Sequence, residues 1–312
     1  MSVIGIDHGT RAIRFFILPE GIGFEIPREK KDFSVLEEIE KRIPLEKIEL
    51  VALTYSMGDG INKITDIKKV KNRGVISRVA GEVKGVGTKV FDEIASSELR
   101  AIVIPGLHRG IEVLDKRFRA LYSHCASAEK VSLCYDAYLK VKKKNFIVCD
   151  ISSNTVTIAI KNQRFFGAID ACLGAIGIYH GFLDLDAIRK VDAKAITANM
   201  AFSRGGAIKI HSNVEEILQA KNERAKLALE AMLLSIKMEI FGFLSEVKPQ
   251  AFVISGWAGV NDNIFYPLKK SLEQIAPVIK LDHFAPARGS AEIAIDVLKG
   301  KKDFLGINLD NC

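Results

Sequence analysis

The sequence lacks any apolar stretch long enough to cross a membrane. No window of about 18 residues is both apolar and uncharged, whereas a membrane-spanning helix needs about 20 such residues. The N-terminus also lacks the basic segment that opens a signal peptide, and Asp7 interrupts the first apolar run. We therefore expect a cytoplasmic protein with neither a membrane span nor a cleaved leader.

Cysteines are few and do not form a motif. There are five in 312 residues, an odd number, and no two have Cys-x-x-Cys spacing. This pattern argues against a disulfide framework and against a structural zinc site, and it favours reduced thiols.

Aromatic residues are scarce around the basic runs. The net charge is +7, but the lysines gather only in short runs at 68–69, 142–144 and 299–302. Few aromatic residues stand among them, so the runs indicate a solvated surface rather than a nucleic-acid interface. The positive balance still favours an anionic ligand such as a nucleotide.

The chain has enough apolar material for two α/β domains. Hydrophobic residues make up 48% of 312 residues. The first part predicts a meander of three strands, then a helix and a further strand, at residues 3–7, 12–18, 24–27, 33–43 and 50–55. Residues 58–88 predict a glycine-rich loop. Later elements are expected at residues 90–94, 101–104, 126–138, 213–247, 251–255, 261–275, 278–281 and 289–298.

The opening pattern occurs twice. After a polar break at residues 142–145, an apolar strand again ends in an aspartate, Asp150, and a turn and two further strands follow. A strand-Asp-turn-strand-strand unit that opens each of two similar halves indicates a duplicated fold. We expect the halves to be 1–140, with a loop-rich insertion at 56–109, and 141–312.

The first candidate site is Asp7-His8-Gly9-Thr10. In a tight hairpin, Gly9 lets the backbone approach a phosphate, and turn N–H groups and the Thr10 hydroxyl can donate to phosphate oxygens. Asp7 at the strand end can hold a hydrated Mg²⁺. The same four residues also suit an ordinary turn.

The second candidate site is the hairpin after Asp150, with Ser152, Asn154 and Thr155. In a duplicated fold it would face the first hairpin across a cleft. Two carboxylates aimed at one site repel each other unless a cation lies between them, so Asp7 and Asp150 are both predicted metal ligands. A plain β-hairpin remains the alternative.

The third candidate site is Ser255-Gly256-Trp257-Ala258-Gly259, which follows an apolar strand. Small residues between a strand and a helix let a flat ring or a phosphate approach the backbone. A close turn without a ligand remains the alternative.

The order of these three motifs resembles the phosphate-1, phosphate-2 and adenosine motifs of the actin, sugar-kinase and heat-shock-chaperone superfamily. The resemblance implies two ribonuclease-H-like domains hinged around a central cleft that binds ATP and Mg²⁺. Asp7, Gly9 and Thr10 match the first motif, whereas Ser152 stands where a glycine is usual. Arg11 replaces a small hydroxyl residue, and it either reaches a phosphate or faces solvent. Small residues in 287–294 resemble the superfamily's last connecting helix, where two helices cross closely.

A narrower resemblance links the chain to the methanogenesis marker protein 12 family of methanogenic archaea. The blocks that carry it are residues 4–10, 55–61, 87–94, 104–109 and 181–189. The family is tied to methanogens by occurrence and implies no reaction. By fold analogy, the chain is most similar to acetate and butyrate kinases.

The insertion at 56–109 is the expected place for substrate contacts on the wall of the cleft. Its glycines Gly81, Gly85 and Gly87 would permit movement, Arg109 would clamp a carboxylate or phosphate, and His108 would act as acid or base. A surface loop without contact to the cleft is the alternative for the segment, and a structural role is the alternative for His108.

Two functions follow from these motifs. The first is an ATP-dependent phosphotransferase that acts on a small anionic substrate. The second is a nucleotide-dependent assembly or regulatory protein with a protein partner and no kinase activity. A remnant fold without nucleotide binding and a homodimer are both left open.

Overall fold

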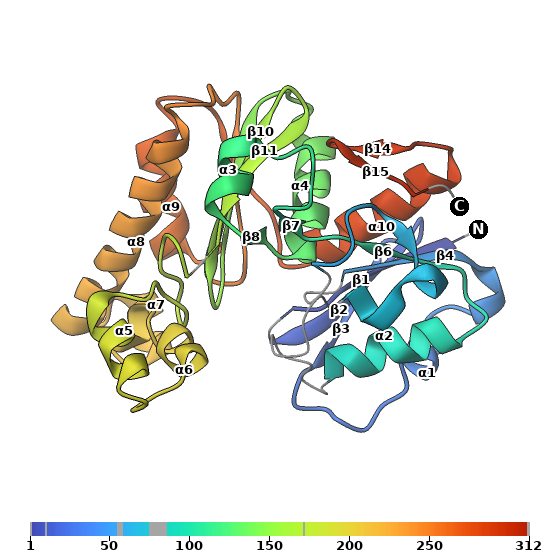
Figure 1. Ribbon diagram of the computed structural model, residues 1–312, viewed down its shortest axis with the longest axis horizontal. Coiled ribbons are helices and arrows are strands. Elements are labelled where there is room, and N and C mark those ends of the chain that lie inside the picture. Colours follow the sequence, from blue (N-terminus) through green and yellow to red (C-terminus); the bar gives the residue numbers. More distant parts are fainter. Residues whose placement is uncertain (1, 10, 55–58, 75–85, 171, 311–312) are drawn as a thin grey trace. The chain divides into compact units, whose positions relative to one another are not determined.

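The computed structural model describes residues 2–9, 11–54, 59–74, 86–170 and 172–310. Two compact units make up the chain. Unit 1 contains Met1–Lys142 and Phe284–Cys312, and unit 2 contains Lys143–His283 (Figure 1). The boundary after Lys142 lies within the polar break expected at 142–145.

Unit 1 is built on a six-stranded sheet with the order β3-β2-β1-β4-β6-β5. The strands are β1 Ser2–Asp7, β2 Ala12–Leu18, β3 Ile22–Pro27, β4 Ile48–Thr54, β5 Thr65–Asp66 and β6 Ala101–Ile104. All six residues of β1 are buried, as expected for a central strand. Strand β1 runs antiparallel to β2 and parallel to β4, so Asp7 and Thr54 both lie at the carboxyl ends of neighbouring parallel strands.

Helices cover both faces of this sheet. The helices of unit 1 are α1 Val35–Glu40, α2 Val86–Ser96, α3 Lys116–Leu121, α4 Ala128–Val141 and α10 Ala285–Leu298. One face packs its isoleucines against α1 and α2, and the other face contacts α10, which in turn packs on α4. Two small ribbons complete the unit, β7 Leu107–His108 with β8 His124–Ala126, and β14 Asp303–Phe304 with β15 Ile307–Asn308.

At two points helix α10 lies so close to a neighbouring element that only glycine fits. A Cβ on Gly289 would overlap the carbonyl oxygen of Ser132 in α4, and a Cβ on Gly5 would overlap the carbonyl oxygen of Ala287. The Ser290 hydroxyl donates to the Ser132 hydroxyl at 2.8 Å across the same crossing. The expected close crossing of two helices is therefore present.

The C-terminal segment departs from the expected division into 1–140 and 141–312. Residues 284–312 belong to unit 1, because α10 buries its small residues against β1, β4 and α4. The helix also begins at Ala285, earlier than expected, with Pro286 in its first turn, where proline is well tolerated.

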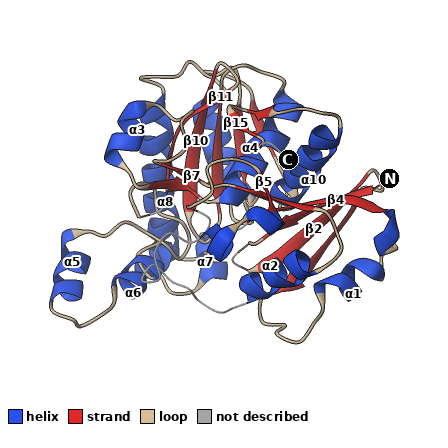
Figure 2. Ribbon diagram, turned by 45° about the vertical axis from the view of Figure 1, so that its right-hand side comes forward, coloured by secondary structure: helices blue, strands red, loops and turns tan. Residues whose placement is uncertain are grey.

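Unit 2 is built on a five-stranded sheet with the order β11-β10-β9-β12-β13. Its strands are β9 Phe146–Ile151, β10 Thr155–Lys161, β11 Arg164–Ile169, β12 Phe252–Ser255 and β13 Val278–Lys280. Its helices are α5 Leu185–Asp192, α6 Ala198–Ser203, α7 Val214–Gln219, α8 Glu223–Phe243 and α9 Asp262–Leu272 (Figure 2). The helix expected over 213–247 is two helices, because Ala220 has a φ of 50° and Asn222 caps α8.

The two sheets share one arrangement. In each unit the first strand pairs antiparallel with the second and parallel with the strand that follows a helical crossover, giving β3-β2-β1-β4 and β11-β10-β9-β12. The expected duplication is therefore confirmed. No helix in the described ranges is long and apolar enough to span a bilayer.

The insertion at 56–109 is more ordered than expected in its described parts. Strand β5 and short 3-10 turns occupy residues 65–74, and α2 begins at Val86 rather than near residue 90. Gly81 and Gly85 lie outside the described residues, while Gly87 lies in α2.

Candidate functional site

Asp7 is a buried carboxylate at the end of β1. Its side chain is only 1% exposed, and its Oδ2 contacts Nη1 of Arg14 at 3.3 Å. Its Oδ1 is buried and has no hydrogen-bond partner among the described residues. An unpartnered buried carboxylate oxygen is costly, so this atom is a candidate ligand for a cation or donor.

Arg14 organises the first hairpin. It stands opposite Asp7 in the strand register and also pairs with Glu25 through Nε at 3.3 Å. A Cβ on Gly9 would lie 2.5 Å from Nη1 of Arg14 and 2.8 Å from the carbonyl oxygen of Ala12. Glycine is therefore required at this position by the hairpin's own packing, whether or not a phosphate also approaches.

The side chain of Arg28, just after β3, holds the turn through hydrogen bonds to the backbone of the turn. Its Nε donates to the carbonyl oxygen of Gly9 at 3.0 Å, and its Nη2 donates to that of His8 at 3.2 Å. Burial lowers the pKa of the Arg28 guanidinium, although Asp7 and Glu129 counteract this effect. The His8 N–H donates to the Thr54 hydroxyl at 3.2 Å, which ties the turn to β4 as well.

The first turn of α4 contributes a second carboxylate. Glu129 accepts a hydrogen bond from Ser127 Oγ at 2.5 Å and lies 3.4 Å from Nζ of the buried Lys130. Its other oxygen, Oε2, is buried and has no hydrogen-bond partner in the described part of the chain. The charge of Glu129 acts on Asp7, so the two carboxylates share one electrostatic environment.

The environment raises the pKa of Asp7 from 3.8 to about 6. Burial is the main cause, and the negative charge of Glu129 adds to it, while Arg14 and Lys130 act in the opposite direction. A carboxylate with a raised pKa beside a second carboxylate gains stability when a cation binds between them.

These residues fit a bound Mg²⁺. The ion usually keeps several waters and takes one or two carboxylates plus phosphate oxygens, so it does not require a full protein cage. Asp7 Oδ1 and Glu129 Oε2 would supply the carboxylate oxygens. Within the described ranges no group of three or more His, Cys, Asp or Glu residues forms a metal cage.

Unit 2 brings the second and third sequence motifs together. Asp150 and Ser255 stand opposite each other in the register of β9 and β12, and both are buried. The carbonyl oxygen of Ile151 accepts from the N–H groups of Ala258 and Gly259 at 3.1 and 2.9 Å. The Ser255 hydroxyl has no hydrogen-bond partner among the described residues.

Two glycines allow this close packing. Gly256 has a φ of +89°, which favours glycine, and its missing Cβ leaves room for the carbonyl of Ile151 and the hydroxyl of Ser152. A Cβ on Gly259 would overlap the carbonyl oxygen of Ser255. Trp257 is partly buried beside them.

The other residues of the second hairpin have structural partners. Asn154 donates through Nδ2 to Asp170 at 3.1 Å, and its carbonyl accepts from the Ser152 N–H at 2.7 Å. The hydroxyl of the buried Thr155 donates to the carbonyl oxygen of Ile176 at 2.9 Å. The Thr155 hydroxyl is thus committed within unit 2.

The remaining predicted residues differ in their exposure. His108 is 3% exposed, and both ring nitrogens are engaged, Nδ1 by the Gly110 N–H at 3.2 Å and Nε2 with the Ile61 carbonyl at 3.1 Å. Arg109 and Arg11 are exposed. Thr10 lies outside the described residues.

Sequence reasoning missed three charged residues of the site, Arg14, Arg28 and Glu129. They lie in β2, just after β3 and at the start of α4. The signal that could have found Arg14 is a cation on a central strand, opposite the aspartate in a two-strand hairpin.

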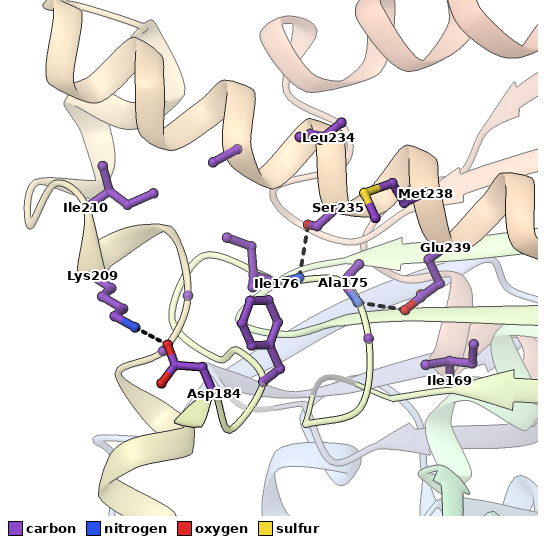
Figure 3. Close-up of a pocket in the computed structure, with 15 residues that line it drawn as sticks. Ile169, Ala175, Ile176, Asp184, Lys209, Ile210, Leu234, Ser235, Met238 and Glu239 are labelled. Atoms are coloured by element: carbon purple, nitrogen blue, oxygen red, sulfur yellow. Dashed lines mark hydrogen bonds and ion pairs between the residues drawn. The ribbon is translucent and has the colours of Figure 1, made fainter. Parts of the chain in front are cut away.

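Unit 2 also contains an apolar pocket of about 790 Å³ (Figure 3). Lys209 and Asp184 form an ion pair of 2.6 Å at one side, and Ser235, Met238 and Glu239 of α8 lie at the other. Glu239 accepts from the Ala175 N–H at 2.6 Å. Burial raises the pKa of Glu239 to about 7, although hydrogen bonds from Thr157 and Ala175 oppose the shift.

Glu239 should make the stability of unit 2 depend on pH. Its folded pKa lies above the unfolded value of 4.5, so the folded state binds the proton more tightly and loses stability as pH rises from 4.5 to about 7. The expected loss is about 3 kcal/mol. Glu239→Gln should remove this component while keeping the hydrogen bond from Ala175. Denaturant unfolding of both proteins across this pH range measures the difference. A parallel pH dependence in both proteins would contradict the assignment, and Glu40→Gln, at an exposed position, is the control.

Solved structures establish the fold class. An acetate kinase from Porphyromonas gingivalis has a TM-score of 0.63 at 12% identity, with 95% of this chain and 99% of that chain covered. A propionate kinase from Francisella tularensis has a TM-score of 0.65 at 13% identity, covering 92% and 98%. A ROK family glucokinase from Streptomyces griseus, solved with glucose and AMPPNP, has a TM-score of 0.52 at 13% identity, covering 95% and 100%. The expected actin-like ATPase fold is confirmed.

Sequence relatives of this chain occur in methanogens, and no family model matches the chain. A UPF0285 protein of Methanocaldococcus jannaschii is 50% identical over 326 aligned positions, which cover 99% of each chain. Those of Methanococcus vannielii and Methanothermobacter thermautotrophicus are 48% and 43% identical, with 99% and 98% of each chain covered. At this identity over nearly the whole length, the chain belongs to the UPF0285 protein family.

Proposed function

We propose that this protein is an Mg·ATP-dependent phosphotransferase that acts on a small anionic acceptor. The observation that carries the proposal is that Asp7 and Glu129 each have a buried carboxylate oxygen with no hydrogen-bond partner in the described ranges. They lie within a kinase-like fold and are framed by Arg14, Arg28 and Lys130. The acetate and propionate kinases whose structures resemble this one are named for small carboxylates.

Each unit contains motifs that we propose to bind the nucleotide or its metal ion. In unit 1, Asp7 and Glu129 would hold Mg²⁺, and the backbone of the turn held by Arg28 would face the phosphates. In unit 2, the glycine turn at Gly256 would accept the flat adenine ring, and Asp150 would be a further metal ligand. Bound Mg²⁺ would neutralise the phosphate charge.

Transfer would rest on positioning and charge, with no side chain required as a base. His108, a predicted acid or base, has both ring nitrogens engaged by backbone groups. A carboxylate acceptor is already deprotonated at neutral pH and needs no base. Arg109 is exposed and remains a proposed clamp for the acceptor, as does the insertion at 56–109.

A nucleotide-dependent regulatory protein is the second candidate. The observation that favours it is the commitment of the Thr155 hydroxyl and the close packing of Ser152 against Gly256, which leave fewer donors for a second phosphate contact. Such a protein would bind Mg·ATP and change its partner affinity without transferring phosphate.

Two measurements test these proposals. Titration calorimetry with ATP in the presence and absence of Mg²⁺ should show metal-dependent binding. A coupled assay for ADP with acetate, propionate, butyrate and glucose should show acceptor-dependent turnover. Binding without turnover for any acceptor would favour the regulatory function. Absence of binding would contradict both.

Two further assignments remain proposals. We propose that the UPF0285 family coincides with the methanogenesis marker protein 12 family that the sequence blocks resemble, and that the protein acts in the cytoplasm. Fractionation of methanogen cells with an antibody would test the location.

A further inference from the structure

Helix α8 presents an apolar stripe that unit 2 does not cover. Leu227, Leu234, Met238 and Phe241 are 56%, 57%, 67% and 42% exposed, and Ala231 lies between them. Their spacing alternates four and three residues, the seven-residue repeat of helices that pack against a second helix. The opposite face of α8 is buried in unit 2, and Ala231, Leu234 and Met238 of the stripe lie at the edge of the apolar pocket of unit 2.

Four residues of the stripe, from Leu227 to Met238, face one another when a second copy is reversed. If a second α8 is laid antiparallel about an axis between residues 232 and 233, Ala231 faces Leu234 of the other copy, and Leu227 faces Met238. A small side chain then meets a larger one in the inner layers, which allows interdigitation. A surface that complements its own reversed copy is what a two-fold interface requires.

Opposite charges lie near the same axis at the edge of the stripe. Glu230 and Lys237 flank the apolar residues on one side, and neither pairs with another charge among the described residues. In the antiparallel arrangement, Glu230 of each copy lies within about two residues of the level of Lys237 of the other, or about 3 Å along the helix, which allows two ion pairs. This charge complementarity favours a second copy as the partner.

We propose that the protein is a homodimer formed by antiparallel packing of α8 against α8 of a second copy. The stripe spans about 21 Å of helix, at 1.5 Å per residue. A standard interface buries about 800 Å² on each partner, more than one helix face supplies. The exposed Phe182, which lines the apolar pocket with Ala231, Leu234 and Met238, adjoins the stripe and would be buried with it.

The first test is sedimentation velocity of the full chain over a wide concentration range. The wild type should be a dimer. Leu234→Arg, which places two like charges close to the axis, should yield a monomer with unchanged circular dichroism. Leu121→Arg, at a 71% exposed leucine on α3 of unit 1, should remain a dimer. A wild-type monomer at all concentrations, or a dimer that Leu234→Arg leaves intact, would overturn the proposal.

The second test examines the antiparallel register. Glu230→Lys should weaken the dimer by at least about tenfold, since two ion pairs are lost and two like-charge contacts replace them. Adding Lys237→Glu should restore the wild-type dissociation constant, because both pairs reform with reversed signs. Failure of the double variant to recover would refute the antiparallel pairing. These variants leave Asp7 and Glu129 unchanged, so loss of the dimer and loss of nucleotide binding are distinguishable.

Discussion

The Asp7→Asn variant is expected to lose most of the Mg²⁺-dependent affinity for ATP. A carboxylate that contacts Mg²⁺ in a buried site contributes on the order of 2–4 kcal/mol, or about 30-fold to 1000-fold in affinity. Asparagine keeps the shape of Asp7 but removes the charge. Affinity measured without Mg²⁺ should change far less.

The same variant should fold at least as well as the wild type in the absence of ligand. Burial raises the pKa of Asp7 from 3.8 to about 6, so the ionised side chain costs the folded state about 3 kcal/mol at neutral pH. Part of this cost disappears with the charge. A loss of binding without a loss of thermal stability would thus separate function from folding.

Glu25→Gln is the matched control for Asp7. Glu25 is the other carboxylate that pairs with Arg14, at 3.3 Å, but its side chain is 44% exposed. The affinity of the Glu25→Gln variant for Mg·ATP should stay near the wild-type value in calorimetry. Equal Mg·ATP affinity in Asp7→Asn and the wild type would remove Asp7 from the metal site.

The Gly289→Ala variant is expected to cause a large loss of stability in unit 1. The added Cβ would overlap the backbone carbonyl of Ser132, and a backbone atom cannot rotate away as a side chain can. Helix α10 would have to move off α4, which would also disturb the hydrogen bond between Ser290 and Ser132. Overpacking of this kind costs about 3 kcal/mol or more.

Gly242→Ala should change the stability of the protein in the opposite direction in the same measurement. Gly242 also lies in a helix, but a Cβ there would meet nothing within 4 Å. Alanine should therefore stabilise the protein by about 0.5–1 kcal/mol through its helix propensity. Denaturant unfolding compares both variants with the wild type. If Gly289→Ala is as stable as the wild type, the close crossing of α10 and α4 is wrong.

Much of the fold was predictable because its signals are local. The strand ending at Asp7 and the strand ending at Asp150 each form a short apolar run before a turn, and β6 matches its expected bounds of 101–104. Helix ends were less predictable. The break between α7 and α8 depends on one residue, Ala220, in a left-handed conformation that its side chain does not favour.

The candidate site was predictable in part. Asp7 and Gly9 are adjacent in the sequence and stand out as a motif. Arg28 and Glu129 do not, since Arg28 acts through a hydrogen bond to Gly9 and Glu129 through its charge on Asp7, both far away in the chain. Sequence spacing cannot show that both reach the end of β1.

The two related α/β halves follow from local signals, because strand periodicity and a repeated acidic hairpin are properties of neighbouring residues. The return of residues 284–312 to unit 1 follows from packing in three dimensions, since it depends on Gly5 and Gly289 leaving room for α10. Packing also leaves one oxygen each of Asp7 and Glu129 without a hydrogen-bond partner among the described residues. Burial and hydrogen bonding result from packing between distant segments, and no local pattern specifies them.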